Sequence, residues 1–406
     1  MPVFAVTTAR GPNWDRALGI REQAYWAEHS AFADGLLARG VVIIGGPVGD
    51  EDAADADDLA LLAVEAADEA AAWSVFDADP WTAHRVFRVK DVRPWRLWLD
   101  GRSRLDGGVR RVRVGTPAGQ FTVWTRRVGD NPAVKVLLLH GGPGATHEYL
   151  RACDGYLPGA GIEYYYYDQL GSGLSDQPDD PSLWRVDRFV DEVEQVRGAL
   201  GLDRDNFVLY GHSWGGILAL EYALAHQEHL RALVISNMMA SAPAYTAYAE
   251  QVLTPAMDAG ALAEIRALEA AGDTANPRYM ELLVPHYYEH HVLRMPAERW
   301  PEPVVRAFDA INHEIYDPMQ GPSELGMSPQ AALARWDRVA DLDRIEVPAL
   351  VIGARYDTMD PAHMEMMALR LPAGRYLHCP NGSHMAMWDD QETYFAGLLD
   401  FLGGLA

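Results

Sequence analysis

The sequence predicts an α/β protein in two parts, and three observations support this fold class. Residues 1–98 carry strand and helix signals in the order β-α-β-β-α-β, which is typical of a ferredoxin-like α+β domain. Residues 109–406 alternate eight short apolar runs with helical patterns, which predicts a mainly parallel eight-stranded sheet. Between the sixth and seventh runs, about 110 residues have mainly helical periodicity, which predicts a helical cap at about residues 240–345.

Composition limits the partners that the chain can have. The 406 residues are 49% hydrophobic and 23% charged, values typical of a folded protein. With 58 acids against 34 bases the net charge is -24, which disfavours binding to nucleic acid or to an anionic membrane surface. No run of 18 apolar residues is present, so no membrane span is expected. Two cysteines give no disulfide framework and the first residues do not resemble a signal peptide, so we predict a reducing, cytoplasmic location.

The elements of the N-terminal domain follow from periodicity and turn residues. Apolar runs predict strands at 4–8, 41–44, 59–64 and 86–92, and helical spacing predicts helices at about 14–37 and 68–78. The polar, glycine-bearing segment 99–108 is expected to be a linker.

Several motifs of this domain resemble the YCII-related family of small dimeric domains. They are REQ at 21–23, His29, GGP at 45–47 and DPW at 79–81. The resemblance implies a homodimer formed through the sheet of this domain. It also implies a suspected catalytic His and Asp pair, which would fall on His29 and an acid of segment 49–52, such as Asp50. A histidine that is only hydrogen-bonded within the fold is the interpretation we favour.

The eight strands of the second part are expected at residues 109–114, 121–127, 134–140, 164–168, 207–210, 233–237, 349–354 and 375–379. Several are nearly continuous apolar runs that end in glycine-rich turns. Such runs are typical of parallel strands that are buried on both faces.

The motif G-x-S-x-G at 211–215 lies between a strand signal and a helix signal. In such a strand-to-helix turn the two glycines permit a strained backbone, the serine hydroxyl is exposed, and the helix N-terminus faces developing negative charge. The motif therefore predicts Ser213 as a nucleophile.

A serine hydroxyl needs a base, and the base needs an acid that orients it. This turn is followed along the chain by the acid and then the histidine, each after a late strand. Asp357 follows the strand at 349–354, and His384 follows the strand at 375–379. We prefer Asp357 to Asp360, because Asp360 precedes a proline and is typical of a helix N-cap, and we prefer His384 to His378, which lies inside a strand.

A tetrahedral intermediate also needs backbone donors for its oxyanion. One is expected from the amide of Trp214, the residue after the nucleophile, and one from the loop HGGPG at 140–144, with Gly142 favoured. A plain tight turn is the alternative interpretation of HGGPG.

The motifs HGGPG at 140–144, DQLGSGLSD at 168–176, GHSWGG at 211–216 and GSHMAMWDD at 382–390 resemble those of the proline iminopeptidase family of α/β-hydrolases. The resemblance covers about residues 108–406. It implies the α/β-hydrolase fold and the release of an N-terminal residue, often proline or an apolar one, from short peptides, amides or arylamides. It implies no metal and no other cofactor.

The resemblance also implies a residue that binds the free amine of the substrate. Glu324 matches a family glutamate with this role, whereas Glu221 is expected to be structural. Thr358 stands where the family often has a second acid, directly after the catalytic aspartate. An esterase or amidase acting on a specialised small molecule therefore remains an alternative, as does a non-catalytic protein that binds a ligand or assembles through its N-terminal domain. The pattern H-x-x-E-H at 286–290 matches a zinc peptidase motif, but we interpret it as part of the cap.

Overall fold

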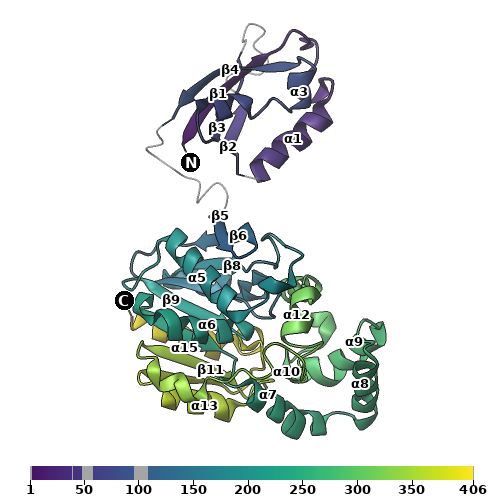
Figure 1. The fold of residues 1–406 in the computed structure, drawn as a ribbon, viewed down its shortest axis with the longest axis vertical. Coiled ribbons are helices and arrows are strands. Elements are labelled where there is room, and N and C mark those ends of the chain that lie inside the picture. The colour runs from purple at the N-terminus through teal and green to yellow at the C-terminus, as the bar shows by residue number, and fades with distance from the viewer. Residues whose placement is uncertain (1, 39, 48–57, 96–107, 406) are drawn as a thin grey trace. The chain divides into compact units, whose positions relative to one another are not determined.

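The computed structural model describes residues 2–38, 40–47, 58–95 and 108–405 (Figure 1). The chain divides into two compact units, Met1–Asp106 and Gly107–Ala406. Among the described residues, no helix has the length and apolar character that crossing a bilayer requires. The expected linker at 99–108 lies outside the described residues except for Gly108.

The first unit contains an antiparallel four-stranded sheet in the order β2-β3-β1-β4. Its elements are β1 (Val3–Arg10), α1 (Trp26–Ala38), β2 (Val42–Pro47), β3 (Asp58–Glu65), α2 (Glu69–Ser74), α3 (Pro80–Ala83) and β4 (Phe87–Pro94). The predicted β-α-β-β-α-β order is confirmed, with the short α3 added before the last strand. The core of this unit includes Phe4, Val6, Val64 and Trp81.

The helix predicted at 14–37 begins only at Trp26, and buried polar bonding explains the difference. Gln23 is 4% exposed, and its Nε2 donates to the backbone oxygens of Asp15 and Leu18. Its Oε1 accepts from the backbone nitrogen of Asp15. Tyr25 has a φ of 63°, which interrupts any helix running into α1. Apolar spacing alone did not reveal this side-chain bonding.

His29 pairs with a different acid from the one expected. Its Nδ1 lies 3.0 and 2.9 Å from the two carboxylate oxygens of Asp79, which also accepts from the backbone nitrogen of Trp81. The imidazole stacks on the Trp81 ring with the centroids 3.8 Å apart. Asp50, the expected partner, lies outside the described residues. Asp79 caps α3, so this acid also has a structural role.

The second unit contains one eight-stranded sheet in the order β12-β11-β10-β9-β7-β8-β6-β5. Its strands are β5 (Val109–Thr116), β6 (Gly119–Val128), β7 (Lys135–Leu139), β8 (Glu163–Asp168), β9 (Phe207–His212), β10 (Ala232–Ser236), β11 (Ala349–Ala354) and β12 (Gly374–Cys379). The pairs β5–β6 and β6–β8 are antiparallel and the other five are parallel. The mainly parallel eight-stranded sheet is therefore confirmed.

Helices cover both faces of this sheet. Those that pack on its strands are α5 (Val186–Leu200), α6 (Trp214–His226), α13 (Pro361–Arg370) and α15 (Gln391–Gly403). The other helices of this unit are α7 (Ala242–Tyr248), α8 (Ala259–Ala271), α9 (Pro277–Leu283), α10 (Glu289–His291), α11 (Glu302–Asp309), α12 (His313–Met319) and α14 (Ala386–Asp389). Alternate residues of β7 belong to two different cores, because successive side chains of a strand point to opposite faces. Leu137 and Leu139 pack with α5, α6 and α13, whereas Val136 and Leu138 pack with α15 and part of the cap.

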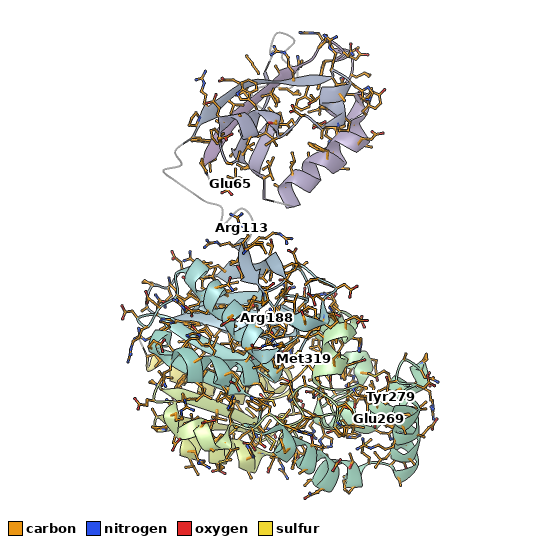
Figure 2. The ribbon with its side chains drawn as sticks, viewed as in Figure 1. Glu65, Arg113, Arg188, Glu269, Tyr279 and Met319 are labelled. Atoms are coloured by element: carbon orange, nitrogen blue, oxygen red, sulfur yellow. The ribbon has the colours of Figure 1, made fainter. Side chains whose placement is uncertain are left out.

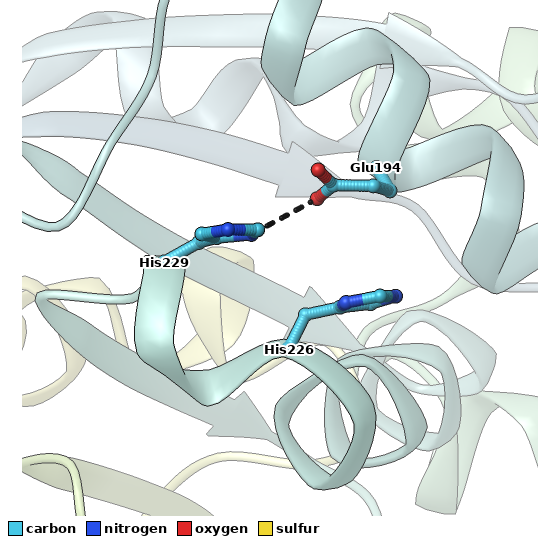
Figure 3. Close-up of side chains that lie close together, drawn as sticks. All are labelled: Glu194, His226 and His229. Atoms are coloured by element: carbon cyan, nitrogen blue, oxygen red, sulfur yellow. Dashed lines mark ion pairs between the residues drawn. The ribbon is translucent and has the colours of Figure 1, made fainter.

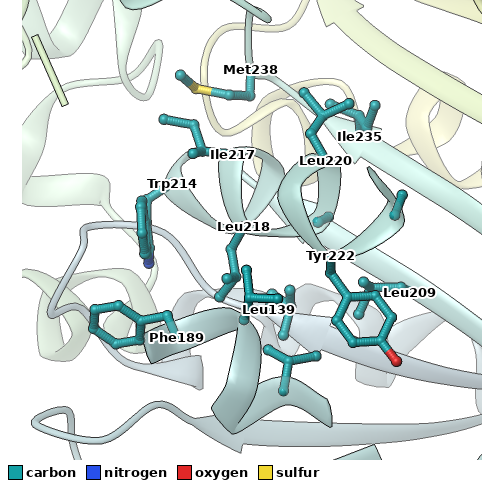
Figure 4. Packing of buried hydrophobic residues seen from close by; sticks show 14 of the residues in the cluster. Leu139, Phe189, Leu209, Trp214, Ile217, Leu218, Leu220, Tyr222, Ile235 and Met238 are labelled. Carbon is teal, nitrogen blue, oxygen red and sulfur yellow. The ribbon is translucent and has the colours of Figure 1, made fainter. Parts of the chain in front are cut away.

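The helix α6 lies against the sheet through a closely packed apolar surface (Figure 4). Leu139, Leu209 and Ile235 come from three neighbouring strands, and Leu218 and Leu220 come from the helix itself. All five side chains are fully buried. This packing fixes the helix whose first residue follows the predicted nucleophile.

The segment between β10 and β11 holds α7 to α12, where the cap was expected (Figure 1). Helices α8 and α9 pack together, and the hydroxyl of Tyr279 on α9 donates to Glu269 on α8 at 2.8 Å (Figure 2). The cap backbone also contacts the loop after β12. The backbone nitrogens of His384 and Met385 donate to the oxygens of His291 and Val292, each at 2.9 Å.

Candidate active site

Ser213 occupies a strained turn between β9 and α6. Its φ is 56° and its ψ is -128°, a backbone conformation that residues other than glycine rarely adopt. A Cβ added to Gly211 would lie 2.0 Å from the oxygen of Gly215, and one added to Gly215 would lie 2.3 Å from the oxygen of Leu139. The two glycines of the motif are therefore required by close backbone approach.

Asp357 and His384 lie in the loops after β11 and β12, and they contact each other. Nδ1 of His384 is 2.8 Å from Oδ1 of Asp357, and both side chains are almost completely buried. Burial alone would lower the pKa of His384, but the charge and hydrogen bond of Asp357 outweigh it, so this pKa is raised above its ordinary value. The bond at Nδ1 leaves Nε2 as the nitrogen that can exchange a proton with a substrate.

A cavity of about 660 Å³ brings the predicted site residues together. Its lining includes Ser213, His384, Gly142 and Glu324. Among the hydrogen bonds of the described residues, none joins the Ser213 hydroxyl to Nε2 of His384. Such bonds are often long before substrate binds. The proximity of the two side chains is indicated instead by the cavity that both of them line.

The loop at 140–144 presents Gly142 to this cavity. The backbone nitrogen of Gly141 already donates to the hydroxyl of Tyr149 at 2.6 Å, so this amide is not available to an oxyanion. Gly142 has a φ of 106°, and a Cβ there would lie 2.6 Å from the nitrogen of Ala145. Trp214 is the first residue of α6, where a backbone N–H has no acceptor within the helix.

Glu324 lies half-buried in the cavity wall. Its Oε1 accepts from the hydroxyl of Tyr316 at 2.6 Å, and its Oε2 accepts from the hydroxyl of Tyr245 at 3.2 Å. Among the described residues that line the cavity there is no lysine and no arginine. The carboxylate is thus oriented by neutral donors and faces no fixed positive charge.

The competing candidates lie elsewhere. Asp360 caps α13 through the nitrogen of Ala362, and His378 is exposed on β12. Glu221 accepts from the indole of Trp336 and from Arg338, so it holds the end of the cap segment on α6.

Two buried hydrogen-bond networks, which the sequence did not predict, stabilise the turn at Ser213. Nδ1 of His212 is 2.9 Å from the hydroxyl of Tyr149, and Nε2 of His212 is 2.9 Å from the backbone oxygen of His384. Burial lowers the pKa of His212 well below its ordinary value, so this imidazole is neutral. Gln169 accepts from the indole of Trp214 at 2.8 Å and donates to the backbone oxygen of His140 at 3.0 Å.

Two further residues contact the acid, and sequence reasoning missed them in this role. Asn237 donates to Oδ2 of Asp357 at 2.7 Å. The hydroxyl of Thr358 lies 3.4 Å from Oδ1 of Asp357 and 3.2 Å from Nδ1 of His384. The sequence signal for Asn237 was its position as the last residue of the strand predicted at 233–237, which on its own is weak.

The described residues contain one group with ligands suited to a metal ion, away from this cavity. It consists of Glu194, His226 and His229, with Nδ1 of His229 3.3 Å from Glu194 (Figure 3). The same carboxylate accepts from Arg197 and Tyr222, so a cation would compete with a guanidinium. In segment 286–290, which carries the zinc peptidase pattern H-x-x-E-H, the Glu289 carboxylate accepts from the backbone nitrogen of Ala297 at 2.7 Å.

Comparisons with known proteins identify the family of this chain. The sequence model of the alpha/beta hydrolase fold family matches residues 135–391, and that of the YCII-related domain matches residues 13–96. A proline iminopeptidase of Elizabethkingia meningoseptica is 55% identical over 72% of this chain and 97% of its own length. The chain belongs to the proline iminopeptidase family of α/β hydrolases.

Further relatives extend this result. A proline iminopeptidase of Flavobacterium johnsoniae is 54% identical over 72% of this chain and 97% of its own length. Among solved structures, VinJ is 30% identical with a TM-score of 0.67 and covers 73% of this chain and 99% of its own. The proline iminopeptidase of Mycobacterium smegmatis is 27% identical with a TM-score of 0.62 and covers 73% of this chain and 98% of its own.

Proposed function

We propose that this chain is a serine aminopeptidase that releases N-terminal proline, or another apolar N-terminal residue, from short peptides, amides or arylamides. The observation that carries the proposal is a single cavity. It is lined by Ser213 of the strained turn, by His384, which pairs with Asp357, and by Glu324. Relatives with 50–55% identity that are named proline iminopeptidases support the same substrate class.

The reaction follows from the chemistry of these groups. The hydroxyl oxygen of Ser213 attacks the substrate carbonyl while Nε2 of His384 takes its proton, and Asp357 stabilises the imidazolium. The amides of Gly142 and Trp214 donate to the oxyanion of the tetrahedral intermediate. When the intermediate collapses, His384 returns the proton to the leaving amine and an acyl-enzyme remains. The same imidazole then takes a proton from water as the water attacks the ester, the N-terminal residue leaves as the free acid, and His384 returns the proton to the oxygen of Ser213.

Glu324 is proposed to bind the free amine of the substrate. A protonated N-terminal amine is a donor without an acceptor function, and a carboxylate is its strongest partner. Because two tyrosine hydroxyls orient the carboxylate, little side-chain entropy is lost when the amine binds.

One observation favours an alternative within the same mechanism. The side chain of Thr358 contacts both Asp357 and His384. Unlike an acid at this position, it has no negative charge with which to bind the amine of the substrate. An amidase or esterase with a weaker requirement for a free amine is therefore the second candidate.

The test is a substrate profile with a matched inactive variant. Proline arylamide is compared with N-acetylproline arylamide and with a proline ester, each with wild type and Ser213→Ala. We expect turnover of the free-amine arylamide by wild type, and stoichiometric labelling of wild type but not of Ser213→Ala by a phosphonofluoridate. Equal turnover of the acetylated substrate would instead support the second candidate. Absence of labelling of wild type would contradict a serine hydrolase mechanism.

We also propose a cytoplasmic location and a homodimer formed through the N-terminal domain. The first is supported by the two buried free thiols, Cys153 and Cys379, since such thiols persist in reducing compartments. The second is supported by the likeness of residues 13–96 to the YCII-related domain.

A further inference from the structure

Asn237 lies at the centre of the predicted catalytic machinery without belonging to it. It directly follows β10, the strand between β9, which leads to Ser213, and β11, which leads to Asp357. Its side chain is fully buried. Nδ2 donates to Oδ2 of Asp357 at 2.7 Å and to the backbone oxygen of Ser383, the neighbour of His384, at 3.2 Å.

The other end of the amide is held as well, so its orientation is determined. The hydroxyl of Ser236 donates to Oδ1 of Asn237 at 2.7 Å and lies 2.7 Å from the hydroxyl of Tyr394. That hydroxyl contacts the hydroxyl of Tyr210, and burial raises the pKa of both tyrosines, so both remain protonated. Proton donors therefore run in one direction, from the tyrosines through Ser236 and Asn237 to Asp357, and each bond of such a chain strengthens the next.

The backbone of Asn237 is strained and fixed. Its φ is 53°, a left-handed conformation that asparagine tolerates better than most residues. Its backbone nitrogen donates to the oxygen of Ile352 in β11 at 2.8 Å, and the nitrogen of Ser213 donates to the oxygen of Ser236 at 3.0 Å. Strain of this kind persists where the surrounding structure enforces it, which is common at functional sites.

The two oxygens of Asp357 have different partners. Oδ1 accepts from His384 and from the backbone nitrogen of Met359, at 2.8 and 3.1 Å. Among the described residues, the donor to Oδ2 is Asn237. Loss of this donor would leave one oxygen of a buried carboxylate unsatisfied and its plane less restrained.

We propose that Asn237 is a positioning residue for the reaction. Through its bond to Oδ2 it sets the plane of the Asp357 carboxylate so that Oδ1 faces Nδ1 of His384, and it joins the loops that carry these two residues. This inference rests on the proposed function, in which Ser213, His384 and Asp357 form a catalytic triad.

The test compares three variants by kinetics. Asn237→Gly fits the left-handed backbone and removes the amide, whereas Asn237→Asp keeps the size and the backbone tolerance but replaces a donor by an acid. Asn381→Asp, at an exposed position in the loop before His384, is the matched control. For proline arylamide we expect Asn237→Gly to lower kcat about 100-fold with KM within about twofold, because the base is misplaced while substrate contacts remain. We expect Asn381→Asp to resemble wild type.

The pH profile adds a readout that a purely structural role would not change. In Asn237→Asp the introduced carboxyl can donate to Asp357 only while it is protonated. We therefore expect kcat to fall as the pH rises through its ionisation, since two facing carboxylates repel. The Asn381→Asp control should show no such added ionisation.

The outcomes separate this inference from the proposed function. If wild type is labelled by a phosphonofluoridate but a folded Asn237→Gly keeps kcat within twofold, the positioning role is wrong. If wild type itself is not labelled, the proposed triad fails first. Should both Asn237 variants fail to fold, Tyr394→Phe removes one donor of the same chain at a greater distance. A fall of about threefold in kcat at unchanged KM would support the role, and an unchanged kcat would overturn it.

Discussion

His384 shows how opposing effects on one side chain set the working pH. Burial disfavours its imidazolium, but the adjacent Asp357 carboxylate more than compensates, and the pKa is raised above 6.5. In the proposed mechanism the imidazole takes the proton of Ser213, which it can do only when it is neutral. We therefore expect kcat/KM to rise with pH and to reach half its plateau above pH 6.5. A midpoint below 6.5, measured with proline arylamide at constant ionic strength, would contradict this ordering of effects.

Glu324 allows a second test on one side chain. Glu324→Gln keeps the size and one acceptor but removes the charge that would face the substrate ammonium. Charge-assisted bonds are worth about 1.5–3 kcal/mol, so we expect kcat/KM for proline arylamide to fall about 10- to 100-fold. N-acetylproline arylamide serves as the control substrate, because its acetylated amine has no charge to lose. An equal loss for both substrates would show that the carboxylate supports the cavity and does not bind the amine.

The residues that sequence reasoning missed share one property. Tyr149 meets His212 across 63 positions, and Asn237 meets Asp357 across 120. A local motif such as G-x-S-x-G reports its own turn, and strand order places the acid and the base at one edge of the sheet. Contacts between side chains from distant loops depend on the angles at which those loops leave the sheet, which periodicity does not encode.

The turn that carries Ser213 requires glycine at position 215, because the backbone of β7 lies too close to admit a side chain. In Gly215→Ala the new Cβ would start 2.3 Å from the oxygen of Leu139, so either the strand or the helix must shift. We expect a loss of about 1–3 kcal/mol in the free energy of unfolding, measured in urea. Gly198→Ala on α5 is the matched control, since nothing lies within 4 Å of its Cβ position. There we expect a gain of about 0.5–1 kcal/mol from helix propensity.

Strands were easier to predict than helix boundaries in this chain. The eight strands of the large sheet each begin and end within about two residues of the predicted bounds, because apolar runs between turn residues define them clearly. The first helix was predicted about 12 residues too long at its start, since Gln23 and Tyr25 stabilise an irregular segment that has helical apolar spacing. The pairing of His29 with Asp79 was missed because the acid lies in a short turn far along the chain.

The division of the chain into two units predicts that the second unit alone is sufficient for catalysis. Every residue proposed for the site lies in the unit Gly107–Ala406, and relatives of about that length are covered over 97% of their own chains. We therefore expect a protein comprising residues 107–406 to hydrolyse proline arylamide with a kcat/KM within about threefold of the full chain. A loss of activity in a folded truncation would show that the N-terminal unit contributes to the site.

The same truncation tests assembly. If the N-terminal domain mediates a homodimer, light scattering at micromolar concentration should give twice the chain mass for the full protein and the monomer mass for residues 107–406. A monomeric full chain would contradict the proposed dimer.

The bonds between the backbones of His291 and Val292 and the loop of His384 bear on how a peptide enters. A cap bonded there cannot move away from His384 at this point without breaking these two backbone hydrogen bonds. The end of a peptide that reaches Ser213 would then have to fit the existing cavity of about 660 Å³, which favours short substrates over long ones.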